Sequence, residues 1–288
     1  MKLGRIITCY REDLILQIKD FYLGGNRTDF LVVAYNEEHV DPSKFSQTEN
    51  FKLVPYRGRD ANGGFIIVQW KTWPKTAAMF PEIGFWVLHD YDVLCKPSDS
   101  DIQSHIKENE YAMLGSPIIL WQEGMPEEDM DCYPFARDYR YWKKVKFLPQ
   151  DAASIEKFES VLKQNFPKIY KGIPTILCGY GDFLATSSKN LMLLADPRLE
   201  PISNGGIEQV PHSVFGYNGI RAVDLREYYS LNISMDNTLY AAFKNKFDIS
   251  HSVKFWPQGN KPALKLRLKR FIKSMLYAPK GISYPKNS

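Results

Sequence analysis

The sequence predicts an α/β fold in which a mostly parallel central sheet carries helices on both faces. Three observations support this. Strand-like and helical patterns alternate through the first half, the strand runs are continuously apolar, and 44% of the 288 residues are hydrophobic. Continuously apolar strands are typical of sheets that are covered on both faces. This hydrophobic content is enough to bury a core, which argues against a disordered chain.

The first half contains alternating strands and helices. Strands are expected at 4–10, 29–35, 50–56 and 85–90, and helices at 13–23 and 65–80, the second of them broken at Pro74. Ligands of such sheets bind beyond the carboxyl ends of the strands. Polar side chains stand at those ends after each of the four strands, namely Tyr10 with Arg11, Tyr35 with Asn36, Arg57 with Arg59, and Asp90 with Asp92.

The second half changes in composition. A capped helix at 99–110 and a strand at 111–120 precede residues 121–149, whose many aromatic and charged residues indicate a long functional loop. A helix near 151–165, a strand at 176–187, a helix ended by Pro197 and a strand at 220–225 are expected next. This organisation predicts a first half at 1–115, a second half of the same domain at 116–260, and a tail at 261–288.

The tail has apolar residues at helical spacing and a face of lysine and arginine at 262–277. This pattern is typical of an amphipathic basic helix on an anionic membrane surface. The alternative is a C-terminal helix that docks on the protein and exposes a solvated basic face.

Charge and cysteine content indicate which partners and compartment to expect. The net charge of +4 is mild and does not suggest nucleic acid. The four cysteines show no CxxC pair and no zinc spacing, so they are interpreted as reduced thiols. The N-terminus lacks a signal peptide and no window reaches ~18 apolar residues, so we expect a cytoplasmic protein, peripheral on the inner face of the membrane if the tail binds there.

The Asp-x-Asp pattern occurs three times, and its context separates the copies. Residues 99–101 open a helix, where capping and the helix dipole explain them, and residues 129–131 lie in an acidic, solvated loop. Asp90 and Asp92 instead follow a buried strand, FWVLHDYDV. Two carboxylates so close repel each other unless a cation lies between them. Mg²⁺ and Mn²⁺ take such ligands together with substrate phosphates, so a metal-diphosphate site is predicted; the alternative is a strand-end turn or a salt-bridged pair.

These residues resemble the GT-A glycosyltransferases, whose metal-binding DXD motif ends a strand of a nucleotide-binding sheet. The matching segments are FWVLHDYDV, IITCYRED at 6–13 and RGRDANGGF at 57–65. The resemblance implies that residues 1–115 form a nucleotide-sugar-binding half and residues 116–260 an acceptor-binding half. It also implies that Asp90 and Asp92 hold Mn²⁺ or Mg²⁺ against the diphosphate of a nucleotide-sugar donor, a UDP-sugar being favoured. The metal is then expected to stabilise the leaving group.

Two carboxylates are candidates for the general base that deprotonates the acceptor hydroxyl. Glu208 follows Gly205 and Gly206 at the start of a helical stretch, where relatives carry an acidic residue on the acceptor side. Asp182, in CGYGDFLATS, is the rival, because its neighbouring glycines allow close backbone approach. Glu208 is favoured, which implies inverting chemistry.

His251 and His212 are the candidates for a third metal ligand. The segment HSVKFWPQGNKP at 251–262 resembles the His…Gly-x-Lys-Pro segment of some retaining relatives, although its gap is longer. That resemblance assigns His251 to the metal and Lys261 to a phosphate. His89 adjoins Asp90 but points to the opposite face of the strand, so a structural role is expected.

The remaining donor contacts are expected at the strand ends. Thr8, Tyr10 and Arg11 are assigned to the base or ribose, Arg57 and Arg59 to the diphosphate, and Tyr91 lies between the paired aspartates. The alternative for the arginines is a solvated loop position. Aromatic residues from Trp121 to Trp142 are predicted either to stack on sugar rings or to pack within the protein.

The predicted function is transfer of a sugar to a hydroxyl of a glycan or lipid-linked acceptor, in bacterial surface-polysaccharide assembly. Two rivals belong to other classes. A metal-dependent nucleotidyltransferase or phosphohydrolase would need more carboxylates around its metals. A non-catalytic nucleotide- or glycan-binding module would keep its function without Asp90 and Asp92.

Overall fold

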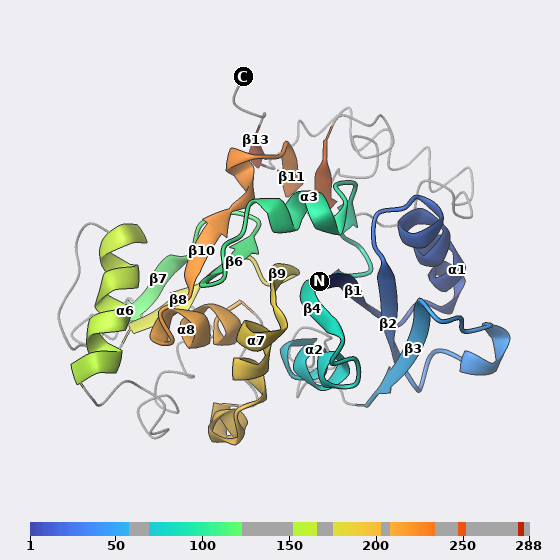
Figure 1. Ribbon diagram of the computed structural model, residues 1–288, viewed down its shortest axis with the longest axis horizontal. Helices are drawn as coiled ribbons and strands as arrows, with labels where there is room; N and C mark the ends of the chain where they lie inside the picture. Colours follow the sequence, from blue (N-terminus) through green and yellow to red (C-terminus); the bar gives the residue numbers. More distant parts are fainter. Residues whose placement is uncertain are drawn as a thin grey trace, which may run out of the picture.

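The computed structural model describes residues 1–57, 69–122, 152–165, 175–202, 208–233, 247–251 and 282–284. Seven strands of this part form the central sheet, in the order β10-β6-β9-β4-β1-β2-β3 (Figure 1). Their bounds are β1 Lys2–Cys9, β2 Phe30–Asn36, β3 Phe51–Tyr56, β4 Ile83–Asp90, β6 Glu110–Met113, β9 Phe183–Ser187 and β10 Arg221–Asp224.

The central sheet is mostly parallel, as predicted. β1 pairs in parallel with β2 and β4, β2 with β3, and β6 with β10. β9 alone among these described strands runs antiparallel, between β4 and β6. All the other strands of the sheet therefore end at one edge, and the predicted Asp90 lies at that edge.

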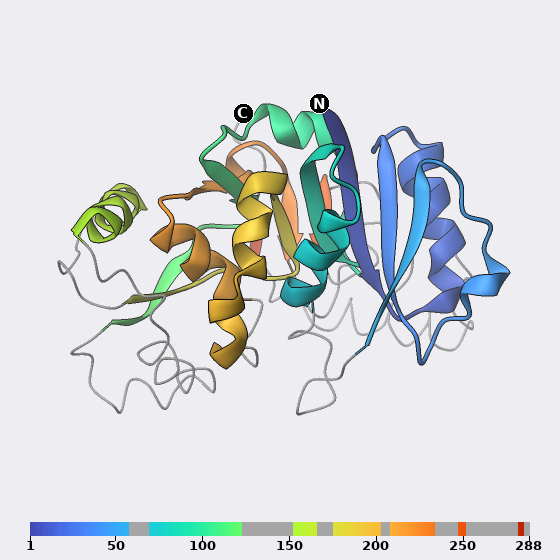
Figure 2. The same ribbon diagram turned by 60° about the horizontal axis from the view of Figure 1, so that its bottom comes forward.

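Helices cover both faces of the sheet (Figure 1). α2 (Gln69–Ala78), α7 (Ser188–Leu191) and α8 (Val210–Tyr217) lie on one face, while α1 (Ile15–Lys19) and α3 (Asp99–Ser104) lie on the other. Figure 2 turns the molecule so that α2 and α7 come forward of the sheet. Neighbouring residues of β1 show why both faces are apolar, since Ile6 packs on the α2 side and Ile7 on the α1 side. The predicted fold class is confirmed.

Two of the predicted strands are each divided in two. The run at 111–120 becomes β6 and β7 (Ile118–Gln122), separated by a turn in which Gly115 has φ 115°, a conformation that favours glycine. The run at 176–187 becomes β8 (Thr175–Cys178) and β9, separated by residues 179–182. β7 and β8 pair with each other instead of extending the central sheet.

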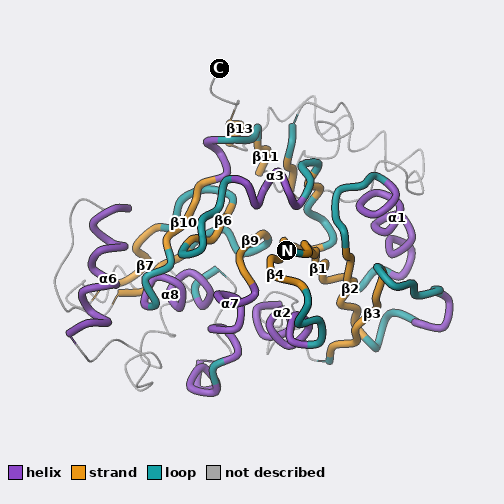
Figure 3. The backbone as a smooth tube through the Cα atoms, in the orientation of Figure 1, coloured by secondary structure: helices purple, strands orange, loops and turns teal. Residues whose placement is uncertain are grey.

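A smaller sheet lies beside α3, in the order β13-β11-β12-β5 (Figure 3). Its strands are β5 Leu94–Cys95, β11 Leu231–Ile233, β12 Ile249–His251 and β13 Ile282–Tyr284. The remaining helix, α6 (Ala152–Asn165), packs against α8. Short helical turns at Glu12–Leu14, Asp20–Gly24, Pro42–Lys44, Met192–Ala195, Pro197–Ile202 and Leu225–Glu227 connect these elements.

Several predicted segments lie outside the described residues. They are residues 123–149 of the loop predicted at 121–149, which include the Asp129–Asp131 pair, the glycines before Glu208, and the basic tail at 262–277. Within the ranges given above, no helix has the length and apolar character needed to cross a membrane.

The second Asp-x-Asp pair opens α3 as predicted, but only one of its carboxylates acts as a cap. Ser98 and Asp101 form a reciprocal capping box. Asp99 is instead 1% exposed and pairs with the buried Arg5 of β1, with Oδ1 2.5 Å from Nη2. Burial alone would lower the Arg5 pKa, but the Asp99 carboxylate raises it overall, so the guanidinium stays charged.

We expect Arg5→Met to lower the free energy of unfolding by about 3–5 kcal/mol, because it leaves the Asp99 carboxylate buried without a counter-ion. The double variant R5M/D99L should recover most of this loss, since it removes both charges. Urea unfolding followed by circular dichroism measures both values. Equal stability of R5M and the unsubstituted protein would contradict the buried pair.

Candidate active site

The acidic pair lies in a tight turn at the end of β4. The Asp90 Oδ1 accepts a hydrogen bond from the Tyr91 backbone N–H at 2.8 Å, and the Asp90 carbonyl accepts from the Val93 N–H at 3.1 Å. The Tyr91 N–H also donates to the Thr8 carbonyl of β1 at 3.0 Å. These bonds fix the turn beside the end of β1, and Asp92 remains only 8% exposed within it.

Two acids and one histidine from three separate segments meet at this turn. The His251 Nε2 lies 3.3 Å from the Asp92 Oδ1 and 3.5 Å from the Asp182 Oδ2. The backbone supports the meeting, because the Asp90 N–H donates to the Asp182 carbonyl at 3.2 Å. His251 itself is 5% exposed. The structure therefore brings together two predicted metal ligands, Asp92 and His251, with the predicted base candidate Asp182.

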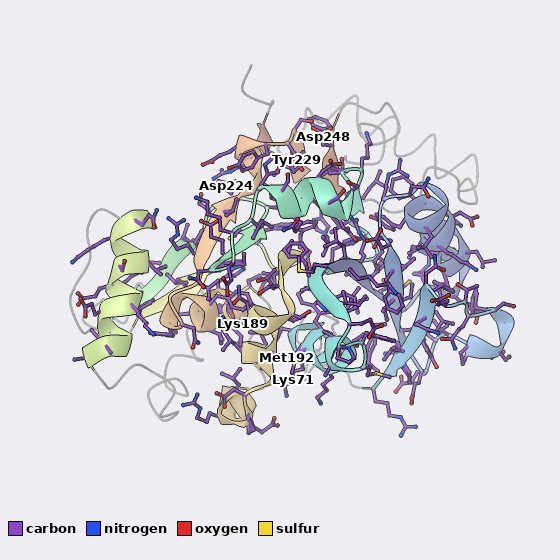
Figure 4. The ribbon with its side chains drawn as sticks, in the orientation of Figure 1. Lys71, Lys189, Met192, Asp224, Tyr229 and Asp248 are labelled. Atoms are coloured by element: carbon purple, nitrogen blue, oxygen red, sulfur yellow. The ribbon has the colours of Figure 1, made fainter. Side chains whose placement is uncertain are left out.

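The smaller sheet explains how His251 comes to contact Asp92, which lies 159 positions earlier in the chain. β5 follows the acidic pair directly, and β12 pairs with it in antiparallel register, Ser250 opposite Leu94. Asp248, labelled in Figure 4, fastens the start of β12, because its Oδ2 accepts from the Ser230 N–H at 2.9 Å. Strand pairing thus places the residue after Ser250 beside the turn that holds Asp92.

Tyr180 joins this group through its hydroxyl, which hydrogen-bonds the His251 Nδ1. Burial raises the pKa of Tyr180, and the nearby Asp182 and Asp92 raise it further, so the hydroxyl keeps its proton. Sequence reasoning missed this residue. The available signal was its position between Gly179 and Gly181 in a stretch otherwise interpreted as a strand.

Glu208 lies near the same group and has its own environment. Its carbonyl accepts a hydrogen bond from the Gly179 N–H at 2.8 Å, which ties the segment before α8 to the turn that carries Asp182. Burial raises the pKa of Glu208, and the Asp182 charge adds to this effect. Its Oε2 is buried and has no hydrogen-bond partner among the described residues. A carboxylate with a raised pKa is a stronger proton acceptor than an exposed one.

The other two histidines near the motif are core residues. The His212 Nδ1 binds the Tyr111 hydroxyl at 2.9 Å, and burial lowers the pKa of His212 to about 3. His89 lies on the opposite face of β4, as predicted, with its Nε2 3.3 Å from the Arg5 Nη1. Burial and the Arg5 charge lower the pKa of His89 to about 3. Both imidazoles are therefore neutral.

The predicted donor residues divide into buried and open positions. Thr8 is 1% exposed and its Oγ1 accepts a hydrogen bond from the Trp73 Nε1 at 3.1 Å, so its side chain is part of the core beneath the end of β1. The Tyr10 and Tyr91 hydroxyls bind each other at 2.7 Å across the ends of β1 and β4. Arg57 is exposed and pairs with Glu37. The predicted Arg59 and Lys261 lie outside the described residues.

A groove of about 730 Å³ opens at the end of β1. Arg11 lines it and pairs with Asp13 at 2.5 Å. The lining combines aromatic and cationic side chains with two acids, namely Tyr10, Arg11, Glu12, Asp13, Leu16, His39, Lys44 and Phe45. Aromatic and cationic groups are those that stack on a base and bind phosphate oxygens.

The donor atoms at the turn have the chemistry that a divalent metal needs. Carboxylate oxygens suit both Mg²⁺ and Mn²⁺, and an imidazole nitrogen suits the transition metal. Over the described ranges, however, no three His, Cys, Asp or Glu side chains are arranged to hold a metal ion. Asp92 and His251 contact each other instead, so binding of an ion would replace this contact.

Comparison with known proteins gives similarity of structure only. A crystal structure of the galactosyltransferase LgtC in complex with donor and acceptor sugar analogs has a TM-score of 0.44 and 11% identity, covering 96% of this chain and 98% of that one. An active-site mutant of LgtC has a TM-score of 0.44 and 8% identity, covering 94% and 95%. No family model matches this chain. No curated protein matches it either.

Proposed function

We propose that this protein is a metal-dependent glycosyltransferase that moves a sugar from a nucleotide diphosphate sugar, preferably a UDP-sugar, to a hydroxyl of a glycan or lipid-linked acceptor. The observation that carries the proposal is the meeting of Asp92, Asp182 and His251 at the carboxyl edge of the sheet. Ligands of parallel sheets bind at this edge. The aromatic and cationic groove opens at the same edge.

Asp92 and His251, with Asp90 beside them, are the residues proposed to hold Mn²⁺ or Mg²⁺. When bound, the ion supplies Lewis-acid stabilisation of the diphosphate leaving group. Tyr10 and Arg11 bind the nucleotide from the groove, where the ring stacks and the guanidinium contacts phosphate oxygens. Thr8 and Tyr91 hold the ends of β1 and β4 together, which keeps the two halves of the donor site in place.

Glu208 is the proposed base for the acceptor hydroxyl. Its carboxylate takes the proton as the hydroxyl oxygen attacks the anomeric carbon, which is the inverting route. The raised pKa of Glu208, caused first by burial, strengthens it as a proton acceptor. Asp182 lies with His251 and Asp92 instead, which favours a role on the donor side.

The test of the proposed function is a ligand screen by thermal unfolding. Nucleotide sugars are added singly with Mn²⁺, and we expect at least one to raise the free energy of unfolding by about 2.7 kcal/mol at ~100 times its Kd. The same donor without metal should give a much smaller shift. Product analysis then separates the rivals, because a transferase releases nucleotide diphosphate, whereas a nucleotidyltransferase moves the nucleotide itself. No shift with any nucleotide sugar and metal would count against the proposal.

We extend the proposal to surface-polysaccharide assembly at the cytoplasmic face of the membrane. The support is the helical spacing of apolar residues and the dense basic face in the sequence at 262–277. Each basic residue near an anionic surface adds about 1 kcal/mol of attraction, so such a segment suits contact with a membrane that carries the acceptor lipid.

A further inference from the structure

The hydrogen bond between Tyr180 and His251 decides which nitrogen of the imidazole is available for binding. The Tyr180 hydroxyl contacts the His251 Nδ1, and the rings meet edge to face, with centroids 5.3 Å apart. The Nε2 is left facing Asp92 and Asp182. In a histidine, the hydrogen bond made by one ring nitrogen decides whether the other carries a proton or binds a metal.

The Tyr180 hydroxyl can both donate and accept a hydrogen bond. An imidazole that binds a metal through its Nε2 carries its proton on the Nδ1, and the Tyr180 oxygen lies where it would accept that proton. In the same geometry the His251 Nε2 faces Asp92 and Asp182.

We infer that Tyr180 is a positioning residue for the metal. Its hydroxyl holds the His251 ring in the orientation that presents the Nε2 to the ion. This inference rests on the proposed function, because it takes His251 as a ligand. A metal-binding histidine usually donates its other ring N–H to a neighbouring acceptor, and loss of that acceptor typically costs 10–100-fold in metal affinity. The Tyr180 hydroxyl occupies the position of such an acceptor.

The chain contains a matched control for this contact. Tyr111 and His212 form the same type of pair in the core, hydroxyl to Nδ1 at 2.9 Å. Tyr111→Phe removes a buried tyrosine–histidine hydrogen bond without touching Asp92 or His251. It also tests His212, the other histidine considered as a ligand.

The experiment measures binding of Mn²⁺ and of Mg²⁺ alone, without donor, by titration calorimetry on the full chain. We expect Tyr180→Phe to weaken Mn²⁺ binding by about 10–100-fold. Mg²⁺ binding should fall less, because Mg²⁺ depends on oxygen ligands. Tyr111→Phe should bind both ions as the unsubstituted protein does. Circular dichroism confirms that each variant is folded.

A double-variant cycle separates positioning from any other effect. If Tyr180 acts through His251, Y180F/H251A binds Mn²⁺ no more weakly than H251A alone. Full Mn²⁺ affinity in Y180F, or losses that add in the double variant, would overturn the inference and leave the proposed function standing. A loss in Tyr111→Phe instead would move the ligand to His212. Absence of Mn²⁺ and Mg²⁺ binding by the unsubstituted protein would overturn both the inference and the metal dependence.

Discussion

Replacing Asp92 by Asn is expected to lower glycosyl transfer by more than about 100-fold while the protein stays folded. Loss of groups that only orient a ligand typically costs 10–100-fold, so loss of a proposed ligand should cost at least as much. Asp92 is also the residue that contacts His251 at the end of β4. Turnover of the nucleotide sugar identified in the ligand screen is the measurement, with Mn²⁺ affinity measured on the same sample.

The second Asp-x-Asp pair supplies the control for this variant. Asp101 belongs to the capping box of α3, so Asp101→Asn should reduce stability by ~1 kcal/mol and leave turnover unchanged. Thermal unfolding checks the stability of both variants. Full turnover of Asp92→Asn would contradict the proposed role of Asp92 as a metal ligand.

Replacing Glu208 by Gln is expected to lower kcat by about 100- to 10,000-fold, the usual contribution of a general base. Glutamine keeps the shape of the side chain but cannot take a proton. The donor site should be unaffected, so binding of nucleotide sugar with Mn²⁺ is expected to stay the same. Comparison of kcat with the donor affinity from thermal unfolding measures both effects.

The pH dependence follows from the direction of the Glu208 pKa shift. A base works only when it is deprotonated, so kcat/KM should fall as the pH drops through the pKa of Glu208. Burial raises that pKa, so the fall should occur at higher pH than for an exposed glutamate. The fall should be absent from the residual activity of Glu208→Gln. If Asp182→Asn, rather than Glu208→Gln, removed this limb of the profile, Asp182 would be the base.

The sequence was informative wherever one segment contained the whole signal. A continuously apolar run predicted β4, and the two aspartates after it predicted a polar turn at the edge of the sheet. The placement of His89 on the opposite face of β4 followed from the two-residue period of strands. Asp101 was recognisable as a capping residue, because a capping box depends on residues only three positions apart, here Ser98 and Asp101.

The sequence was less informative where an interaction joins distant segments. Asp99 looked like a capping residue, although its carboxylate pairs with Arg5, 94 positions away. The run at 176–187 looked like one strand, but its halves join different sheets, and residues 179–182 between them carry Tyr180 and Asp182. Apolar periodicity indicates that a residue is buried, but it does not indicate which other segment of the chain covers it.

Sequence alone therefore determined the α/β layers, the edge at which Asp90 and Asp92 lie, and the types of side chain available for a metal. Tertiary structure decided which of these side chains meet. The pairing of β12 with β5 placed His251, rather than His212, beside Asp92. The turn after β8 brought Tyr180 and Asp182 to the same point. The reason is physical: apolar periodicity depends on neighbours along the chain, whereas a site is made by strand pairing between residues that the chain separates widely.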